Sequence, residues 1–146
     1  MESNDRYAAL RLSSQLCFPL YAASKELVRQ YKPFLDPLDL TYTQYIAMMV
    51  LWEKQAISVK DLGEALWLDS GTLTPVLKKL EQKGYLTRQR SEEDERSVVL
   101  SLTESGAALR EAALSVPQRL GSCVRLRPEE VQELYRLLYK VLDGMR

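Results

Sequence analysis

The stretch from Asp69 to Gly84 constrains the fold most, because it defines a helix with a start, a stop and one buried face. Apolar residues recur in it at i, i+3, i+4 and i+7: Leu73, Val76, Leu77 and Leu80. This is the spacing of one apolar helix face. Ser70 and Thr72 are residue types that cap a helix N-terminus, and Pro75 is tolerated in a first turn. Gly84 can adopt the left-handed conformation that ends a helix, so the stretch predicts one short helix.

The opposite face of this helix is polar, with hydroxyl groups near its start and cations later. Its members are Ser70, Thr74, Lys78, Lys79 and Gln82. Hydroxyl and amide side chains can read base edges, and lysines can hold phosphates. Between Ser70 and Arg90 the basic residues are opposed by a single acid, Glu81, although the formal net charge of the whole chain is +0. This local excess indicates a nucleic-acid-binding surface, although an ordinary solvated helix also fits the pattern.

A hairpin is expected directly after this helix. Residues 85–90 and 98–102 both have the composition of strands, and the polar segment 91–97 joins them. Another short helix is expected before it, from Ser58 to Leu66, with Ser58 in a capping position. Two short helices with a tight connection, followed by a hairpin, are typical of a helix-turn-helix with a wing.

The remaining helices complete a mainly α fold of order α-α-α-α-β-β-α-α, a winged helix-turn-helix. They are expected at residues 7–31, from Thr41 or Thr43 to Trp52, at 103–116 with Pro117 near the end or at a kink, and from Pro128 onward. The first and last helices have wide apolar stripes, which a second copy of the chain would bury, although packing on the same monomer also fits. We therefore expect residues 1–42 and 103–146 to form a dimerisation region around a DNA-binding region at 43–102.

Composition excludes several classes of function. The chain has no histidine and two cysteines, so Ser/His/Asp catalysis and a structural zinc site are not expected. Its six glycines form no phosphate-binding loop, and neither a cofactor nor an enzymatic activity is expected. The segment from Met1 to Arg6 is polar, and the longest apolar run, Tyr45 to Trp52, is too short to cross a membrane. We expect a soluble cytoplasmic protein whose cysteines are thiols.

Several motifs resemble one known family. The run DERSVVLSLTESG at 94–106 resembles the wing signature of the multiple-antibiotic-resistance regulator (MarR) family of winged-helix repressors. Further segments resemble the organic-hydroperoxide-resistance regulator (OhrR) branch of that family: LCF at 16–18, LYA at 20–22, QYKP at 30–33, TYTQY at 41–45 and LDSGTLTP at 68–75. The resemblance extends to about residue 116. Pro19 departs from it, since a small helix former is usual at that position.

The resemblance implies a thiol sensor. It makes Cys17 the residue that an organic hydroperoxide oxidises to a sulfenic acid, in a pocket formed by Phe18, Tyr21, Tyr31 and Tyr42. Some members of the branch carry a second cysteine, which would be Cys123 here. That residue resolves the sulfenic acid as a disulfide between subunits. Members without it depend on a low-molecular-weight thiol. Without the resemblance, a cysteine at the helical spacing of Cys17 is more often an inert core residue, and Cys123 could be a buried small hydrophobic residue.

These observations lead to one working hypothesis, a dimeric repressor that binds a pseudo-palindromic operator when reduced and releases it when oxidised. The predicted DNA contacts are Ser70, Thr72, Thr74, Lys78, Lys79 and Gln82 in the major groove, Arg88 and Arg90 at phosphates, and Arg96 in the minor groove, held by Asp94. Three alternatives remain. They are a MarR-family repressor released by a phenolic ligand, a thiol peroxidase and a structural interaction domain.

Overall fold

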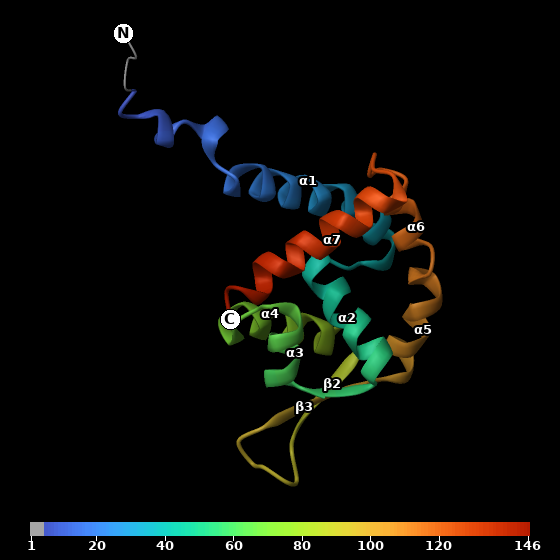
Figure 1. The fold of residues 1–146 in the computed structure, drawn as a ribbon. Helices are drawn as coiled ribbons and strands as arrows, with labels where there is room; N and C mark the ends of the chain where they lie inside the picture. The colour runs from blue at the N-terminus through green and yellow to red at the C-terminus, as the bar shows by residue number, and fades with distance from the viewer. Residues whose placement is uncertain (1–4) are drawn as a thin grey trace.

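Helix α2 (Tyr42–Lys54) lies at the centre of the structure, a computed structural model that describes residues 5–146 (Figure 1). A capping box starts the helix, in which Thr41 Oγ1 accepts from the Gln44 N–H at 3.3 Å and Gln44 Oε1 accepts from the Thr41 N–H at 3.1 Å. Its apolar residues form the middle of the core: Tyr45, Ala47, Met48, Leu51 and Trp52. Of the two threonines at which the sequence allowed this helix to start, Thr41 is the cap.

The helix-turn-helix consists of α3 (Val59–Leu66) and α4 (Ser70–Gln82). Ser58 caps α3 as predicted, with its hydroxyl accepting from the Asp61 N–H at 3.0 Å. The cap of α4 is neither Ser70 nor Thr72 but Asp69, whose carboxylate accepts from the Thr72 N–H at 2.7 Å. A carboxylate at this position also faces the positive end of the helix dipole. Gly84 has a φ of 81°, which confirms the predicted left-handed stop.

The wing is formed by β2 (Leu86–Arg90) and β3 (Val98–Leu102), which pair antiparallel with Leu86 opposite Leu102. A third strand, β1 (Ala56–Ser58), pairs with the other edge of β3, so the order is β1-β3-β2. Sequence analysis did not predict β1, because three residues are too few to show the alternation that identifies a strand. The predicted winged helix-turn-helix is confirmed.

Before α2, the chain contains one long helix, α1 (Cys17–Leu35). It corresponds to the helix predicted at 7–31 but begins ten residues later. Three short 3-10 helices flank α1: η1 (Ala8–Leu10), η2 (Leu12–Ser14) and η3 (Asp36–Leu38). The predicted helix ended at residue 31, two residues before Pro33, but Pro33 lies inside α1 and removes only its own hydrogen bond. The helix continues to Leu35, and the Asp36 N–H still donates to the Lys32 carbonyl. Residues 1–4, the first part of the predicted dimerisation region, lie outside the described residues.

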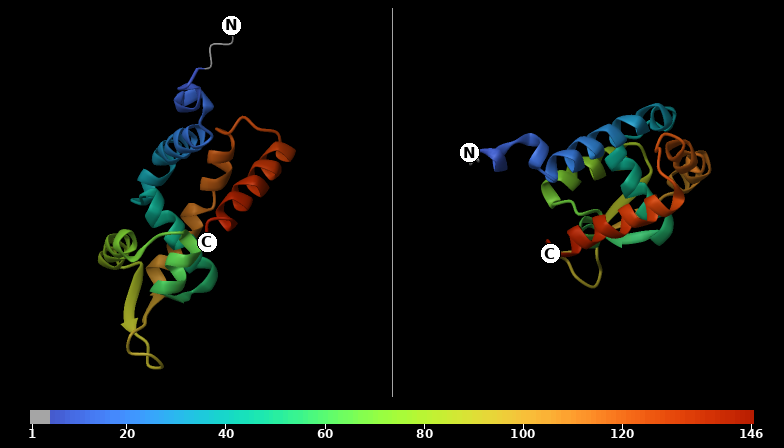
Figure 2. Two further views of the ribbon diagram at one scale, coloured as in Figure 1. Left: turned by 60° about the vertical axis from the view of Figure 1, so that its left-hand side comes forward. Right: turned by 45° about the horizontal axis from the view of Figure 1, so that its top comes forward.

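After the wing, three helices follow: α5 (Glu104–Ala113), α6 (Val116–Gly121) and α7 (Pro128–Asp143). The helix predicted at 103–116 therefore breaks before Val116, and Pro117 lies in the first turn of α6, where a missing N–H is tolerated. Helix α7 begins at Pro128 as predicted and lies at the edge of the molecule (Figure 2), and none of its residues is buried. Within residues 5–146, none of the helices combines the length and apolarity that a membrane span requires.

Gly106 lies at the point where α5 meets the wing and leaves no room for a side chain. A Cβ atom there would lie 2.2 Å from the Tyr85 carbonyl oxygen and 2.9 Å from Leu102 Cδ1. The Gly106 carbonyl also accepts from the buried Trp52 indole N–H at 2.8 Å. The glycine in the family-like run at 94–106 therefore allows two segments to approach closely.

We predict that Gly106→Ala lowers the free energy of unfolding by about 1–3 kcal/mol, because the new methyl group must displace backbone. Urea unfolding followed by circular dichroism measures this change. Gly121→Ala is the matched control, since a Cβ there meets no atom within 4 Å. Equal stability of the two variants would contradict the assigned close contact.

Candidate functional site

The Cys17 thiol is exposed and belongs to the first residue of α1. Pro19 is the third residue of the same helix, so its missing N–H is one that has no partner within the helix in any case. Pro19 therefore lies in the first turn of α1, where proline is tolerated, and not at a kink inside the helix. The other first-turn N–H groups lie beside Cys17 as hydrogen-bond donors. Phe18 and Tyr21, the nearest predicted pocket residues in the chain, are 43% and 61% exposed.

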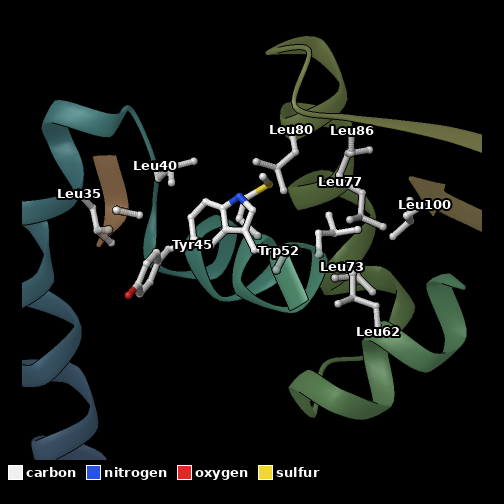
Figure 3. Close-up of a cluster of buried hydrophobic side chains, with 14 of the residues drawn as sticks. Leu35, Leu40, Tyr45, Trp52, Leu62, Leu73, Leu77, Leu80, Leu86 and Leu100 are labelled. Carbon is white, nitrogen blue, oxygen red and sulfur yellow. The ribbon is translucent and has the colours of Figure 1, made fainter. Parts of the chain in front are cut away.

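A cluster of three tyrosine rings lies where the end of α1 meets the start of α2. The ring centroid of Tyr31 is 4.8 Å from that of Tyr42 and 5.7 Å from that of Tyr45. Tyr45 also packs edge-on against Trp52, and in Figure 3 its hydroxyl points away from that indole. The sequence had placed Tyr31 and Tyr42 in one pocket, and the structure adds Tyr45. We call these three residues the tyrosine cluster.

Burial controls the ionisation of the tyrosine cluster. Burial, followed by the neighbouring Tyr42 and Tyr45 phenols, raises the pKa of Tyr31 to about 12 from 10.0. Burial also raises the pKa of Tyr42, and burial together with Tyr42 raises the pKa of Tyr45. All three phenols therefore keep their protons at neutral pH and can donate hydrogen bonds.

The thiol and the tyrosine cluster lie at opposite ends of α1. Cys17 begins the helix and Tyr31 lies in its last part, about 21 Å away at a rise of about 1.5 Å per residue. Tyr42 belongs to the cluster and is equally remote from the thiol. Within one chain, the structure does not bring Tyr31 and Tyr42 to Cys17, and of the predicted tyrosines only Tyr21 lies one helical turn from it.

Cys123 is exposed in the turn after α6, where its thiol donates to the Arg119 carbonyl at 3.7 Å. Helix α6 packs against α1, beside the end of α1 that leads to α2 (Figures 1 and 2). Cys123 therefore lies on the side of the tyrosine cluster and away from the Cys17 of the same chain.

The polar face of α4 is exposed as its sequence predicted. Leu73, Leu77 and Leu80 are buried on the inner face. The predicted base and phosphate contacts of this helix lie on the outer face: Ser70, Thr72, Thr74, Lys78, Lys79 and Gln82. The Thr74 hydroxyl donates to the Ser70 carbonyl at 2.7 Å, so its oxygen remains available as an acceptor.

Two wing residues bond differently from the prediction. Arg88, expected at a phosphate, forms two hydrogen bonds of 3.1 and 3.2 Å with the Glu81 carboxylate and thereby ties β2 to α4. Asp94, expected to hold the Arg96 side chain, accepts instead from the Arg96 backbone N–H at 3.0 Å and shapes the turn. Such short side chains readily bond to the backbone two residues on. Arg96 and Arg90 are exposed, and Arg90 donates to the Glu95 carbonyl at 3.4 Å.

A groove of about 950 Å³ separates α3 and α4 from the wing. Its cationic lining consists of Lys60, Arg88, Arg96 and Arg146. Arg146 reaches it from the end of the chain, where its guanidinium lies 3.7 Å from the centroid of the Trp67 ring and donates to the Glu64 carbonyl at 2.6 Å. In residues 5–146, no three His, Cys, Asp or Glu side chains gather to hold a metal ion.

Comparison with known proteins identifies the family. A family model described as transcriptional regulator SarA/Rot matches residues 29–112. The organic hydroperoxide resistance transcriptional regulator of Bacillus subtilis (strain 168) is 50% identical over 141 residues, which cover 97% of this chain and 96% of that protein. The chain belongs to the organic-hydroperoxide-resistance branch of the MarR family. It is thus a transcriptional regulator of the MarR type, and its relatives are regulators rather than enzymes.

Solved structures of MarR-family regulators have the same fold. Reduced AbfR bound to DNA superposes with a TM-score of 0.76 at 34% identity, over 93% of this chain and 95% of that one. A disulfide-formed AbfR gives a TM-score of 0.65 at 35% identity, over 97% and 99%. A mutant MarR from E. coli, complexed with operator DNA, gives 0.75 at 30% identity, over 87% and 93%.

Sequence analysis did not predict three contacts in the tyrosine cluster and around α4. Tyr45 was assigned to the core helix alone, although its spacing of three residues from Tyr42 places both on one side of α2. The Arg88 bond to Glu81 and the Lys83 bonds described below join elements that are separate in the chain, and no local pattern signals them.

We predict that Tyr31 makes stability fall at high pH. The unfolded phenol loses its proton near 10.0 whereas the folded one keeps it to about 12, so this contribution is present below the lower value and is lost toward the higher one. Urea unfolding at about pH 8 and about pH 11 should show a larger loss for the wild type than for Tyr31→Phe. Tyr7→Phe, which alters an exposed ring, serves as the control and should behave like the wild type. Parallel losses in wild type and Tyr31→Phe would contradict the prediction.

Proposed function

We propose that the protein is a redox-sensing repressor. Its reduced dimer binds operator DNA, and oxidation of Cys17 by an organic hydroperoxide releases it. The observation that carries this proposal is an exposed thiol at the first residue of α1, in a chain that is 50% identical to an organic hydroperoxide resistance regulator. A thiol that an oxidant can reach is a requirement for a redox sensor.

Binding to DNA is proposed through α4 and the wing. The exposed hydroxyl and amide groups of α4 would face base edges in the major groove, while Lys78 and Lys79 would contact phosphates. Arg96 at the wing tip would enter the minor groove. The similarity to AbfR and MarR structures solved with DNA supports this arrangement. Arg88 would act mainly by fixing the wing to α4 through Glu81.

Dimerisation is proposed for residues 1–42 and 103–146, with residues 43–102 forming the DNA-binding region. Helix α7 exposes a long row of large apolar side chains: Val131, Leu134, Tyr135, Leu137, Leu138, Tyr139 and Val141. The N-terminal part exposes more: Tyr7, Leu10, Leu12, Leu16, Phe18, Leu27 and Val28. Apolar surface of this extent is normally covered in a soluble protein. In a two-fold dimer, α7 and the N-terminal part of one copy would be covered by α7 and the N-terminal part of the other.

The dimer would also complete the sensor. Because α1 holds Cys17 and Tyr31 at opposite ends, an antiparallel pair of α1 helices brings the thiol of one copy to the tyrosine cluster of the other. Tyr31 and Tyr42 of the second copy would then donate hydrogen bonds to the Cys17 sulfur, and Phe18 and Tyr21 would supply apolar surface for an alkyl group. Cys123 of the second copy would lie near the same thiol, since α6 packs beside the cluster end of α1.

The proposed oxidation proceeds in two steps. The Cys17 sulfur attacks the peroxide, an S–O bond forms as the O–O bond breaks, and the products are a sulfenic acid and an alcohol that takes up the proton. The Cys123 thiol then gives up its proton and its sulfur attacks the Cys17 sulfur. An intersubunit disulfide forms as the S–O bond breaks, and the sulfenic hydroxyl leaves with that proton as water. Without Cys123, a low-molecular-weight thiol would take its place. The disulfide-formed AbfR structure shows that a similar protein forms a disulfide.

We predict that Cys17→Ser binds operator DNA as tightly as the reduced wild type and no longer releases it with cumene hydroperoxide. Fluorescence anisotropy of labelled operator DNA, titrated with and without peroxide, measures both affinities. Cys123→Ser should still release DNA, but should form no disulfide between subunits in a non-reducing gel. Should Cys17→Ser still release DNA on oxidation, the sensor assignment would fail. Release by salicylate-like phenols alone would support the ligand-controlled alternative.

We predict that the sensor is shared between subunits, so defects on separate chains should complement each other. A mixed dimer of Cys17→Ser and the double variant Tyr31→Phe/Tyr42→Phe contains one intact site if thiol and tyrosines come from different chains. It contains none if they come from the same chain. In a Cys123→Ser background, where the sulfenic acid is not converted to a disulfide, differently tagged, co-purified mixed dimers should therefore form one sulfenic acid per dimer with peroxide, detected with a dimedone probe. Labelling no faster than in the double-variant homodimer would contradict the shared site.

A further inference from the structure

The C-terminal end of α4 is bonded to the segment before α2 by one side chain, Lys83. Its ammonium group donates to Gln44 Oε1 at 3.1 Å and to the Asp39 carbonyl, and it lies 3.4 Å from Asp39 Oδ2. The Lys83 side chain is 23% exposed, whereas Lys78 and Lys79 are exposed on the outer face of the helix. Lys83 is therefore directed into the protein and away from the proposed DNA-binding face.

Gln44 Oε1 connects Lys83 to the start of α2. The same oxygen accepts the Thr41 N–H at 3.1 Å in the capping box, and the Gln44 side chain is buried. Tyr42 is the first residue of α2, and Tyr45 follows Gln44 directly, so two members of the tyrosine cluster lie in the turn that carries this oxygen. A displacement of the Tyr42 ring that turns the start of α2 therefore moves the acceptor of Lys83.

Apart from the Lys83 bond to Gln44, the contacts between α4 and α2 are apolar, whereas Arg88 bonds the other side of α4 to the wing. Leu73, Leu77 and Leu80 pack in the hydrophobic core (Figure 3), and such contacts have little directional preference. Hydrogen bonds hold their partners within narrow limits of distance and angle. Within residues 5–146, the side-chain hydrogen bonds between the end of α4 and the segment of α1, η3 and α2 are those of Lys83 with its two partners. Lys83 thus fixes the end of α4 relative to the start of α2.

We propose that Lys83 is a positioning residue that transmits the state of the tyrosine cluster to α4. This inference rests on the proposed function. When oxidation of Cys17 changes what Tyr31 and Tyr42 contact, the first turn of α2 moves, and the Lys83 bridge carries that movement to the end of α4. Helix shifts of about 1–2 Å suffice for switching, because the two α4 helices of a dimer must match one groove spacing together.

The test compares Lys83→Met with Lys83→Arg, which keeps the charge and the hydrogen-bond donors. Lys54→Met removes an exposed lysine at the end of α2 and serves as the matched control. Operator affinity is measured for each protein reduced and after cumene hydroperoxide, with Cys17 oxidation quantified by mass spectrometry. In Lys83→Met, Cys17 should oxidise as in the wild type, while the ratio of oxidised to reduced Kd falls by about tenfold. Lys83→Arg and Lys54→Met should keep the wild-type ratio.

Two results would overturn this role. If the Lys83→Met variant releases DNA on oxidation as the wild type does, Lys83 is only a structural contact, even if the variant is less stable in urea. A parallel weakening of the reduced and oxidised forms, with an unchanged ratio, would lead to the same conclusion. Failure of the proposed function gives a different result, in which the wild type itself keeps its DNA after complete oxidation of Cys17.

Discussion

The burial of one face of α4 against α2 is the interaction on which the rest of the structure depends. Leu73, Leu77 and Leu80 lie in the same core as Met48 and Leu51, so the hydroxyl and lysine side chains of α4 must face outward. Arg88 fixes the wing to this helix, and the caps formed by Ser58 and Asp69 define where the two helices of the helix-turn-helix begin. This packing therefore determines which side chains of α4 form the exposed polar surface.

The second constraint is the rigidity of α1. A continuous helix cannot bend its ends together, so a thiol at its first residue and a tyrosine cluster near its last turn remain apart in a single chain. The chain also leaves the apolar surfaces of α1 and α7 exposed. In the proposed dimer, association of the two copies covers these apolar surfaces. The same association brings the thiol of one copy to the tyrosine cluster of the other. A redox change at that interface would then act directly on the geometry of the dimer.

Much of the fold followed from local patterns because those patterns are strong. The i, i+3, i+4, i+7 spacing of α4, the threonine before α2 and the polar tip of the hairpin each specify an element through nearest-neighbour chemistry. Prediction failed where the signal was short or where two rules competed. Strand β1 has three residues, α1 continues past Pro33, and Asp69 displaced two hydroxyl residues as the cap of α4.

Local sequence patterns were enough to predict the main helices and the hairpin in order, the exposed polar face of α4 and the sensor candidates Cys17, Tyr31 and Tyr42, although not β1 or the break between α5 and α6. They were enough because helix periodicity, capping and motif resemblance depend on residues close together in the chain. The three-dimensional arrangement was needed to show that Tyr45 joins the cluster, that the cluster and the thiol lie at opposite ends of α1, and that Lys83 bonds to Gln44. Those facts depend on how rigid helices are placed in three dimensions, and contacts between distant segments leave no periodic trace in the sequence.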